Sequence, residues 1–214
     1  MTTRIGLLVA LLCCASAAHG QGASTPAASS AEPLRGINAG VSFGGIAVAF
    51  DDEARVSHFA WRVEGGYRFA LWGPLRPVRL TPKLSLLATH VGGMNPSKDS
   101  YAYASVDLAL RATLAKWRIR PYVEPRKATQ TAELLDRRSR ILNYKGSGTA
   151  WSAGIEIPIS PSGRGFELGV TVENGRFTEF EYQKAITPAD VSHKAVAFHV
   201  GWSGPFTGIS LPWR

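Results

Sequence analysis

The sequence predicts an all-β fold, in which eight long antiparallel strands follow one another as an up-and-down meander and close into a transmembrane barrel. Three observations support this prediction. Apolar residues recur at every second position over long segments, short connections alternate with longer ones, and the second face of several strands carries small residues. In residues 196–203 the two faces read Val196, Phe198, Val200 and Trp202 against Ala197, His199, Gly201 and Ser203.

The size difference between the two faces indicates which of them points outward. Eight strands enclose a lumen with room only for side chains, so the small residues belong inside and the large apolar residues face lipid. Closure also pairs every backbone polar group, which a sheet in hydrocarbon requires. The rival fold is a secreted soluble barrel of the lipocalin type, with the apolar face inward. Its lumen would be too narrow for so many large apolar side chains.

The periodicity places every strand in turn. We expect strands at residues 37–50, 57–71, 78–86, 102–114, 118–126, 151–159, 166–173 and 196–206. In the first strand the apolar face is expected to switch at residues 44–45 through a bulge, so that the alternate large residues of 46–50 continue the outer face. The fifth strand is the least regular, because Pro121 and Pro125 interrupt it.

The connections between these strands alternate in length. The tight set lies at residues 73–76, 116–117 and 161–164. The other set has a short loop at residues 51–55, a longer one at 92–99 and two extended ones at about 127–148 and 174–193. Short turns on one side and longer loops on the other are typical of bacterial transmembrane barrels.

The N-terminal segment predicts export. Arg4 precedes an apolar run at residues 5–12 and a stretch of small residues, so residues 1–20 are expected to be a signal peptide cleaved after Ala17 or Gly20. Both cysteines lie inside it, and neither is preceded by the small residue expected before a lipidated cysteine. Residues 21–34 are expected to be a flexible lead-in, 35–206 the barrel and 207–214 a C-terminal tail.

Composition narrows the choice of partner. A hydrophobic content of 45% excludes a disordered chain, and the formal charge of +8 suits either nucleic acid or an anionic membrane surface. The sequence has no nucleic-acid-binding motif, so no nucleic-acid partner is expected. We expect instead outer-membrane lipid and lipopolysaccharide.

These features together resemble the small outer-membrane β-barrels of the OmpA transmembrane-domain, OmpX and OmpW type. The resemblance rests on the signal peptide, the eight alternating strands, the strand entry at residues 120–123 and the aromatic residue Phe206 near the end of the last strand. It implies residence in the cell outer membrane and recognition by the barrel assembly machinery, with an assembly signal formed by Phe198, Val200, Trp202 and Phe206. Because eight residues follow Phe206, either Phe206 or Trp213 could end the strand.

The charged residues on the inward faces are the first candidate site. By parity this set comprises Arg62, Glu64, Arg68, Lys83, Asp107, Arg111, Glu124, Glu156, Glu167 and Glu173. We expect an ion-pair network that plugs the lumen, because so narrow a lumen favours a plug over the alternative, an ion path or proton relay.

A second candidate site lies in the longer loops. Basic residues there are expected to contact lipopolysaccharide phosphates or another anionic partner; they are Arg126, Lys127, Arg137, Arg138 and Arg140. The alternative is an ordinary solvated loop.

The function expected from these features is structural or surface-interacting, in a monomer without enzymatic activity. The alternatives are an outer-leaflet lipid-modifying enzyme and a narrow channel for small solutes. His58, His90 and His193 are placed near the loop-side rim, but no His-x-Ser pair accompanies them. No cofactor or metal is expected, because the histidines lack ligand spacing.

The aromatic residues predict interfacial girdles at both membrane surfaces. One girdle at the short-turn end would contain Trp72, Trp117, Trp202 and Phe206, and one toward the loops would contain Phe50, Tyr101, Tyr103, Phe177 and Tyr182.

Overall fold

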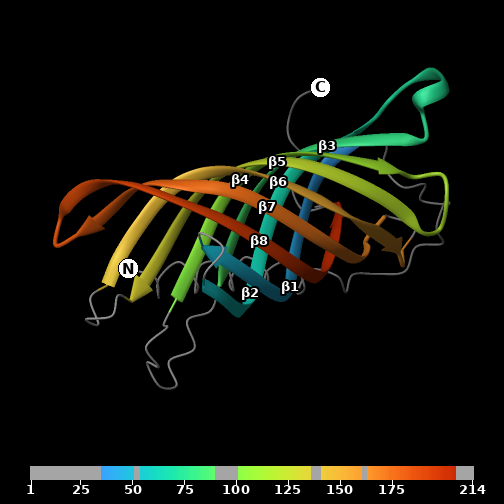
Figure 1. Ribbon diagram of the computed structural model, residues 1–214. Coiled ribbons are helices and arrows are strands. Elements are labelled where there is room, and N and C mark those ends of the chain that lie inside the picture. Colours follow the sequence, from blue (N-terminus) through green and yellow to red (C-terminus); the bar gives the residue numbers. More distant parts are fainter. Residues whose placement is uncertain (1–34, 51–53, 90–100, 136–140, 161–162, 206–214) are drawn as a thin grey trace, which may run out of the picture.

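Eight antiparallel strands form one closed sheet in the computed structural model, each strand pairing with its neighbours in sequence (Figure 1). The structure describes residues 35–50, 54–89, 101–135, 141–160 and 163–205. The strands are β1 (Arg35–Phe50), β2 (Ala54–Ala70), β3 (Val78–Thr89), β4 (Tyr101–Leu114), β5 (Arg120–Leu135), β6 (Ile141–Pro158), β7 (Gly165–Tyr182) and β8 (Ala185–Pro205). The predicted all-β meander of eight strands is confirmed.

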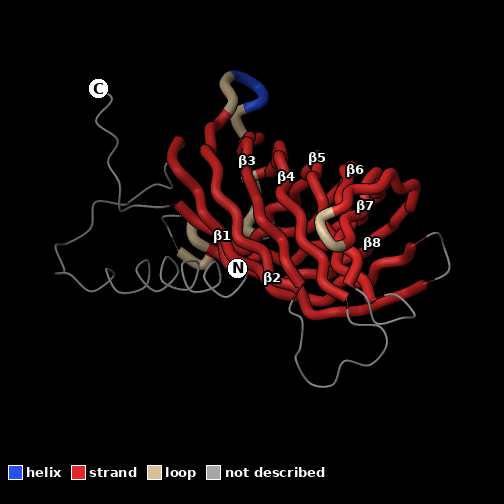
Figure 2. Tube along the Cα trace, turned by 90° about the vertical axis from the view of Figure 1, so that its left-hand side faces the viewer, coloured by secondary structure: helices blue, strands red, loops and turns tan. Residues whose placement is uncertain are grey.

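The two ends of the barrel differ in their connections. A 3-10 helix, η1 (Gly73–Leu75), lies between β2 and β3 at what we term the turn end (Figure 2). The β7–β8 hairpin lies at the opposite end, which we term the loop end (Figure 1). Within the described residues, no helix is long and apolar enough to cross a membrane.

Strand β1 closes the barrel by pairing with β2 on one side and β8 on the other. Neither pairing contains a register shift, and the even-numbered residues of β1 face inward along its whole length. Ile46, Val48 and Phe50 are therefore buried in the lumen, at 2%, 1% and 7% exposure. The predicted face switch at residues 44–45 is wrong. The inward residues of β1 are small or polar up to Gly44 and large and apolar from Ile46 onward. In the sequence alone, this change in the inward residues looks the same as a shift of the apolar residues to the other face.

The strands of the second half are longer than predicted. Strand β5 continues to Leu135 and β6 begins at Ile141, so the predicted loop at residues 127–148 is largely strand. The predicted loop at 174–193 is also wrong, because β7 and β8 are joined at Gln183 and Lys184. These two residues have φ of 49° and 69°, as in a two-residue type I′ hairpin. In these strand ends the outward residues are polar, so apolar and polar residues no longer alternate along the sequence. The periodicity on which the strand prediction depends is therefore absent there.

The outer face carries the large apolar side chains, as a lipid-facing wall requires. Leu108 is 67% exposed, Trp151 64%, Phe59 57% and Phe198 55%. Trp72 and Trp117 are exposed in the turn-end connections. Their placement agrees with an interfacial aromatic girdle at that end.

The lumen is apolar toward the loop end. Its buried apolar cluster consists of Ile46, Val48, Phe50, Ala60, Leu87, Tyr103, Ala132, Phe177, Ala195 and Ala197. The rings of Phe50 and Phe177 are stacked with centroids 6.0 Å apart. Phe50, Tyr103 and Phe177 thus fill the lumen, and their prediction as members of an outer girdle is wrong because all three have inward parity.

Glycines leave room for large lumen side chains. A Cβ atom at Gly169 would overlap both the Tyr122 hydroxyl and the His199 ring, and one at Gly154 would meet the same hydroxyl. By contrast, a Cβ at Gly65, on the outer face of β2, would meet no atom within 4 Å. Gly154 and Gly169 therefore provide the space that the Tyr122 and His199 side chains occupy in the lumen.

We expect Gly169→Ala to lower the free energy of unfolding by about 1–3 kcal/mol, since the added methyl overpacks the lumen. The matched control Gly65→Ala, on the lipid face, should change it by less than about 1 kcal/mol. Urea unfolding of the barrel in lipid vesicles measures both. Equal effects of the two substitutions would contradict the packing described.

Candidate functional site

Arg111 on β4 occupies the centre of the lumen and is 2% exposed. Its Nη1 and Nη2 donate to the two carboxylate oxygens of Glu167 on β7, at 2.5 and 2.7 Å. Its Nε donates to Glu124 on β5. Because β4 and β7 are not neighbours in the sheet, the Arg111–Glu167 pair crosses the lumen. Such fork-to-fork contacts are among the strongest that a guanidinium makes.

The central pair extends into a larger network on the β2–β5 side. Lys83 on β3 donates to Glu64 on β2 and lies 3.6 Å from Glu124. Arg126 on β5 pairs with Glu124 and, at 3.1 Å, with Asp107. Every carboxylate in this network therefore has a cationic partner, which buried charges need.

Two uncharged groups complete the centre. The Tyr122 hydroxyl donates to Glu167 Oε1 at 2.9 Å, and the Arg111 guanidinium lies 4.0 Å from the centre of the Tyr122 ring. His199 Nε2 lies 3.1 Å from the same hydroxyl and 3.3 Å from Glu167 Oε1. Glu167, Tyr122 and His199 thus form a continuous polar contact from β7 through β5 to β8.

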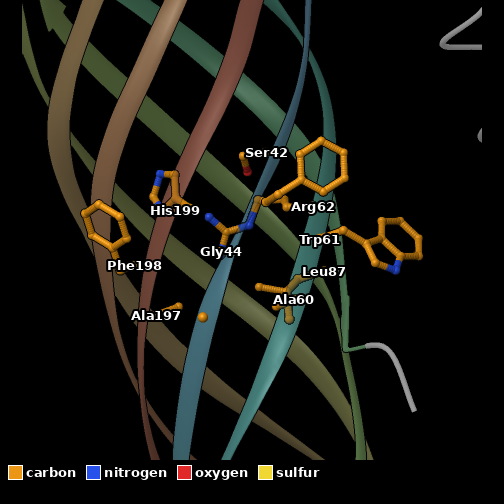
Figure 3. A pocket seen from close by; sticks show the side chains of 11 residues that line it. Ser42, Gly44, Ala60, Trp61, Arg62, Leu87, Ala197, Phe198 and His199 are labelled. Atoms are coloured by element: carbon orange, nitrogen blue, oxygen red, sulfur yellow. The ribbon is translucent and has the colours of Figure 1, made fainter. Parts of the chain in front are cut away.

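Two further charged groups lie in the lumen. Arg68 on β2 pairs with Glu156 on β6 at 3.3 Å, and Arg120 lies 3.9 Å from the same carboxylate. Arg62 contacts the Thr171 hydroxyl at 3.5 Å. It also lines, with His199, a cavity of about 10 Å³ at the border of the apolar cluster, with room for one water (Figure 3).

Glu173 on β7 forms a separate group beneath the apolar cluster. It accepts hydrogen bonds from the Tyr103 hydroxyl and the Gln130 amide, and its Oε1 lies 3.5 Å from His193 Nε2. The His193 ring stacks on Phe177 with centroids 4.6 Å apart. His193 is 2% exposed, so it faces the lumen and its prediction as a rim residue is wrong.

All ten inward charges predicted from parity are buried in the lumen. The structure brings six of them into the central network, namely Glu64, Lys83, Asp107, Arg111, Glu124 and Glu167. Of the other four, Arg62 interacts electrostatically with Glu64, Asp107 and Glu124 of the network. The remaining three lie outside it, namely Arg68, Glu156 and Glu173.

The predicted loop residues separate into three groups. Arg126 is in the lumen at 4% exposure, so its prediction as a loop anion contact is wrong; its parity matched that of Glu124. Lys127 is exposed on the outer wall of β5, where it pairs with Leu108 on β4 and Thr149 on β6. Its assignment to a loop is wrong as well. Arg137, Arg138 and Arg140 lie outside the described residues, as does His90.

The predicted assembly signal lies partly on β8. Phe198, Val200 and Trp202 point outward from this last strand, at 55%, 43% and 37% exposure. Phe206 lies outside the described residues.

Several lumen residues were missing from the predicted set. Among them, Tyr122, Arg126, Gln130 and His199 hydrogen-bond or pair with predicted carboxylates, and Tyr103 reaches Glu173. Inward parity would have identified each of them. The predicted lumen set contained only charged side chains, so the uncharged donors were left out, and Arg126 was left out because it was assigned to a loop.

The network has the composition of a structural plug. In the described part of the chain, six cationic and six carboxylate side chains are buried, so the lumen charges balance. No group of three or more His, Cys, Asp or Glu side chains in the described ranges is arranged to hold a metal ion.

No protein-family model matches the chain, and no curated protein matches it in sequence. Solved structures do match. Neisserial surface protein A (NspA) superimposes with a TM-score of 0.55 at 12% identity, covering 79% of this chain and 97% of its own. Ail of Yersinia pestis gives 0.49 at 11%, covering 78% and 98%. The outer membrane enzyme PagL gives 0.43 at 13%, covering 79% and 99%. At 12% identity the likeness to NspA shows the fold alone, which is that of a small outer-membrane β-barrel, as the sequence predicted.

We expect Glu167→Gln to lower the free energy of unfolding by about 3 kcal/mol or more, because it leaves the buried Arg111 without its bidentate partner. Glu181→Gln is the matched control, since Glu181 pairs with Lys145 on the exposed surface. It should change the free energy of unfolding by less than about 1 kcal/mol. A small effect at Glu167 in vesicle unfolding would argue against an essential central pair.

Proposed function

We propose that this outer-membrane barrel has a structural or surface-interaction role and conducts no solutes. The observation that carries the proposal is the filled lumen. An apolar aromatic cluster occupies its loop end, and the charged network around Arg111 occupies the part below.

The two layers oppose passage for different physical reasons. The apolar cluster is formed mostly by hydrocarbon side chains, and its Tyr103 hydroxyl already donates to Glu173, so the cluster replaces little of the hydration of an ion and entry from the loop end is costly. The Arg111–Glu167 pair spans the lumen from β4 to β7, and a solute would have to break it. Ion conduction and a proton relay are therefore less well supported than a plug.

The surface role follows from the charge of the chain. A formal charge of +8 favours the anionic outer leaflet, where lipopolysaccharide phosphates are the nearest partners. Arg137, Arg138 and Arg140 remain proposed contacts in the β5–β6 connection, together with Lys127 on the wall. Phe198, Val200 and Trp202 remain the proposed signal for the barrel assembly machinery.

We expect purified protein in planar lipid bilayers to give no steady conductance across ±100 mV, since the lumen is filled. The folded state is checked by its altered electrophoretic mobility before heating. Steps of regular amplitude from the folded protein would overturn the plug and support the channel.

Catalysis at the rim is the less supported alternative. His193 is buried among aromatic rings and has no access to outer-leaflet lipid. We expect the mass spectrum of lipid A from cells to be the same with the protein, with its His193→Gln variant and without it. A change in acyl chains that depends on the wild-type protein would support the enzyme instead.

A further inference from the structure

Two buried polar side chains that line the same small cavity have atoms without a protein partner. Arg62 on β2 is 4% exposed and His199 on β8 is 5% exposed, and both line the cavity of about 10 Å³ described above. In the part of the chain that the structure describes, neither Arg62 Nε nor His199 Nδ1 has a hydrogen-bond partner. Buried polar atoms without partners are costly, so these two call for a ligand in the cavity.

The shape of the cavity limits the size of that ligand. The cavity lies where the polar and apolar layers of the lumen meet, and several of its inward lining residues are small, namely Gly44, Ala60 and Ala197. Figure 3 shows the Arg62 guanidinium, the His199 ring and the Ser42 hydroxyl around the same space. Its volume suits a ligand of the size of one water molecule.

The contacts of His199 determine which of its ring nitrogens carries the proton. The Tyr122 hydroxyl donates its single proton to Glu167 Oε1 at 2.9 Å, so its oxygen accepts from His199 Nε2 at 3.1 Å. The other neighbour of Nε2 is Glu167 Oε1 at 3.3 Å, which is also an acceptor. Nε2 therefore carries the proton, and Nδ1 of the neutral ring is an acceptor.

The ligand must accordingly accept a hydrogen bond from Arg62 Nε and donate one to His199 Nδ1. A water molecule does both, and the Ser42 hydroxyl supplies a third partner, which is the usual number for a buried water. A halide ion has no proton to donate. It would also share the surroundings of Arg62 with three carboxylates, namely Glu64, Asp107 and Glu124. Repulsion between these like charges disfavours an anion.

We propose that the cavity binds a single, long-lived water molecule that bridges Arg62 Nε to His199 Nδ1. This rests on the proposed plug and adds the water as one of its structural components. The bridge joins Arg62 to the polar contact that runs from His199 through Tyr122 and Glu167 to Arg111. One chain of hydrogen bonds then crosses the lumen through β2, β8, β5, β7 and β4.

The test is NMR spectroscopy of the isotopically labelled, folded barrel in detergent micelles. A dipolar cross-peak between water and the Arg62 Nε proton reports the bound water, and its sign in rotating-frame spectra distinguishes it from chemical exchange. The nitrogen shifts of His199 report its tautomer. We expect the wild type to show the cross-peak, a protonated Nε2 and an unprotonated Nδ1.

Two variants test whether the water occupies this cavity. Ala60→Val places a larger side chain at the cavity and should abolish the Arg62 cross-peak, because it fills the site. Ala150→Val is the matched control, since Ala150 is an inward alanine at 2% exposure that does not line the cavity. The control should keep the cross-peak and the His199 tautomer. Equal loss of the cross-peak in both variants would contradict a site at this position.

Three results with the wild type would overturn the proposal without relying on any variant. The first is the absence of the dipolar cross-peak at Arg62, and the second is a proton on His199 Nδ1. The third is a shift of the Arg62 resonance when bromide replaces sulfate at constant ionic strength, which would identify a halide as the ligand. Each of these results would leave the plug in place, because the plug is tested separately by bilayer conductance.

Discussion

The closure of β1 onto β8 is the constraint on which the rest of the structure depends. In hydrocarbon an open sheet edge would leave backbone donors and acceptors without partners, and the unbroken β1–β8 pairing removes that edge. Closure with eight strands also determines the width of the lumen. The inward glycines, the dense ion pairs and the aromatic cluster all follow from the need to fill that narrow space.

The contents of the lumen are coupled across the barrel because their partners come from strands that do not touch. Arg111 on β4 holds Glu167 on β7, and Glu167 in turn contacts Tyr122 and His199. The space for Tyr122 comes from glycines on β6 and β7. Removal of one side chain would therefore leave a buried charge or hydroxyl without a hydrogen-bond partner, which is costly where little water is present. Because any rearrangement carries this cost, the network holds the lumen side chains rigidly in place.

The outer wall is apolar in its middle and becomes polar toward the loop end. Toward the loop end, the outward residues of β5–β8 become polar at Lys127, Thr149, Asn174 and Lys194, and Ser57 on β2 is also exposed there. The filled lumen leaves this wall and the exposed connections as the surfaces available to partners.

The sequence by itself determined the strand count, the meander and the inward side of the barrel, because period-two alternation is a local property. It also supplied the ten inward charges, since parity alone assigns a face. Only the tertiary structure decided which charges meet, as Arg111 and Glu167 are far apart in sequence and join through the curvature of the sheet. Closure likewise revealed that Ile46, Val48 and Phe50 remain inside and that Arg126 faces Asp107. The alternation of apolar and polar residues shows where the polarity along a strand changes. Only the pairing register with the neighbouring strands shows whether the side chains have also moved to the other face of the sheet.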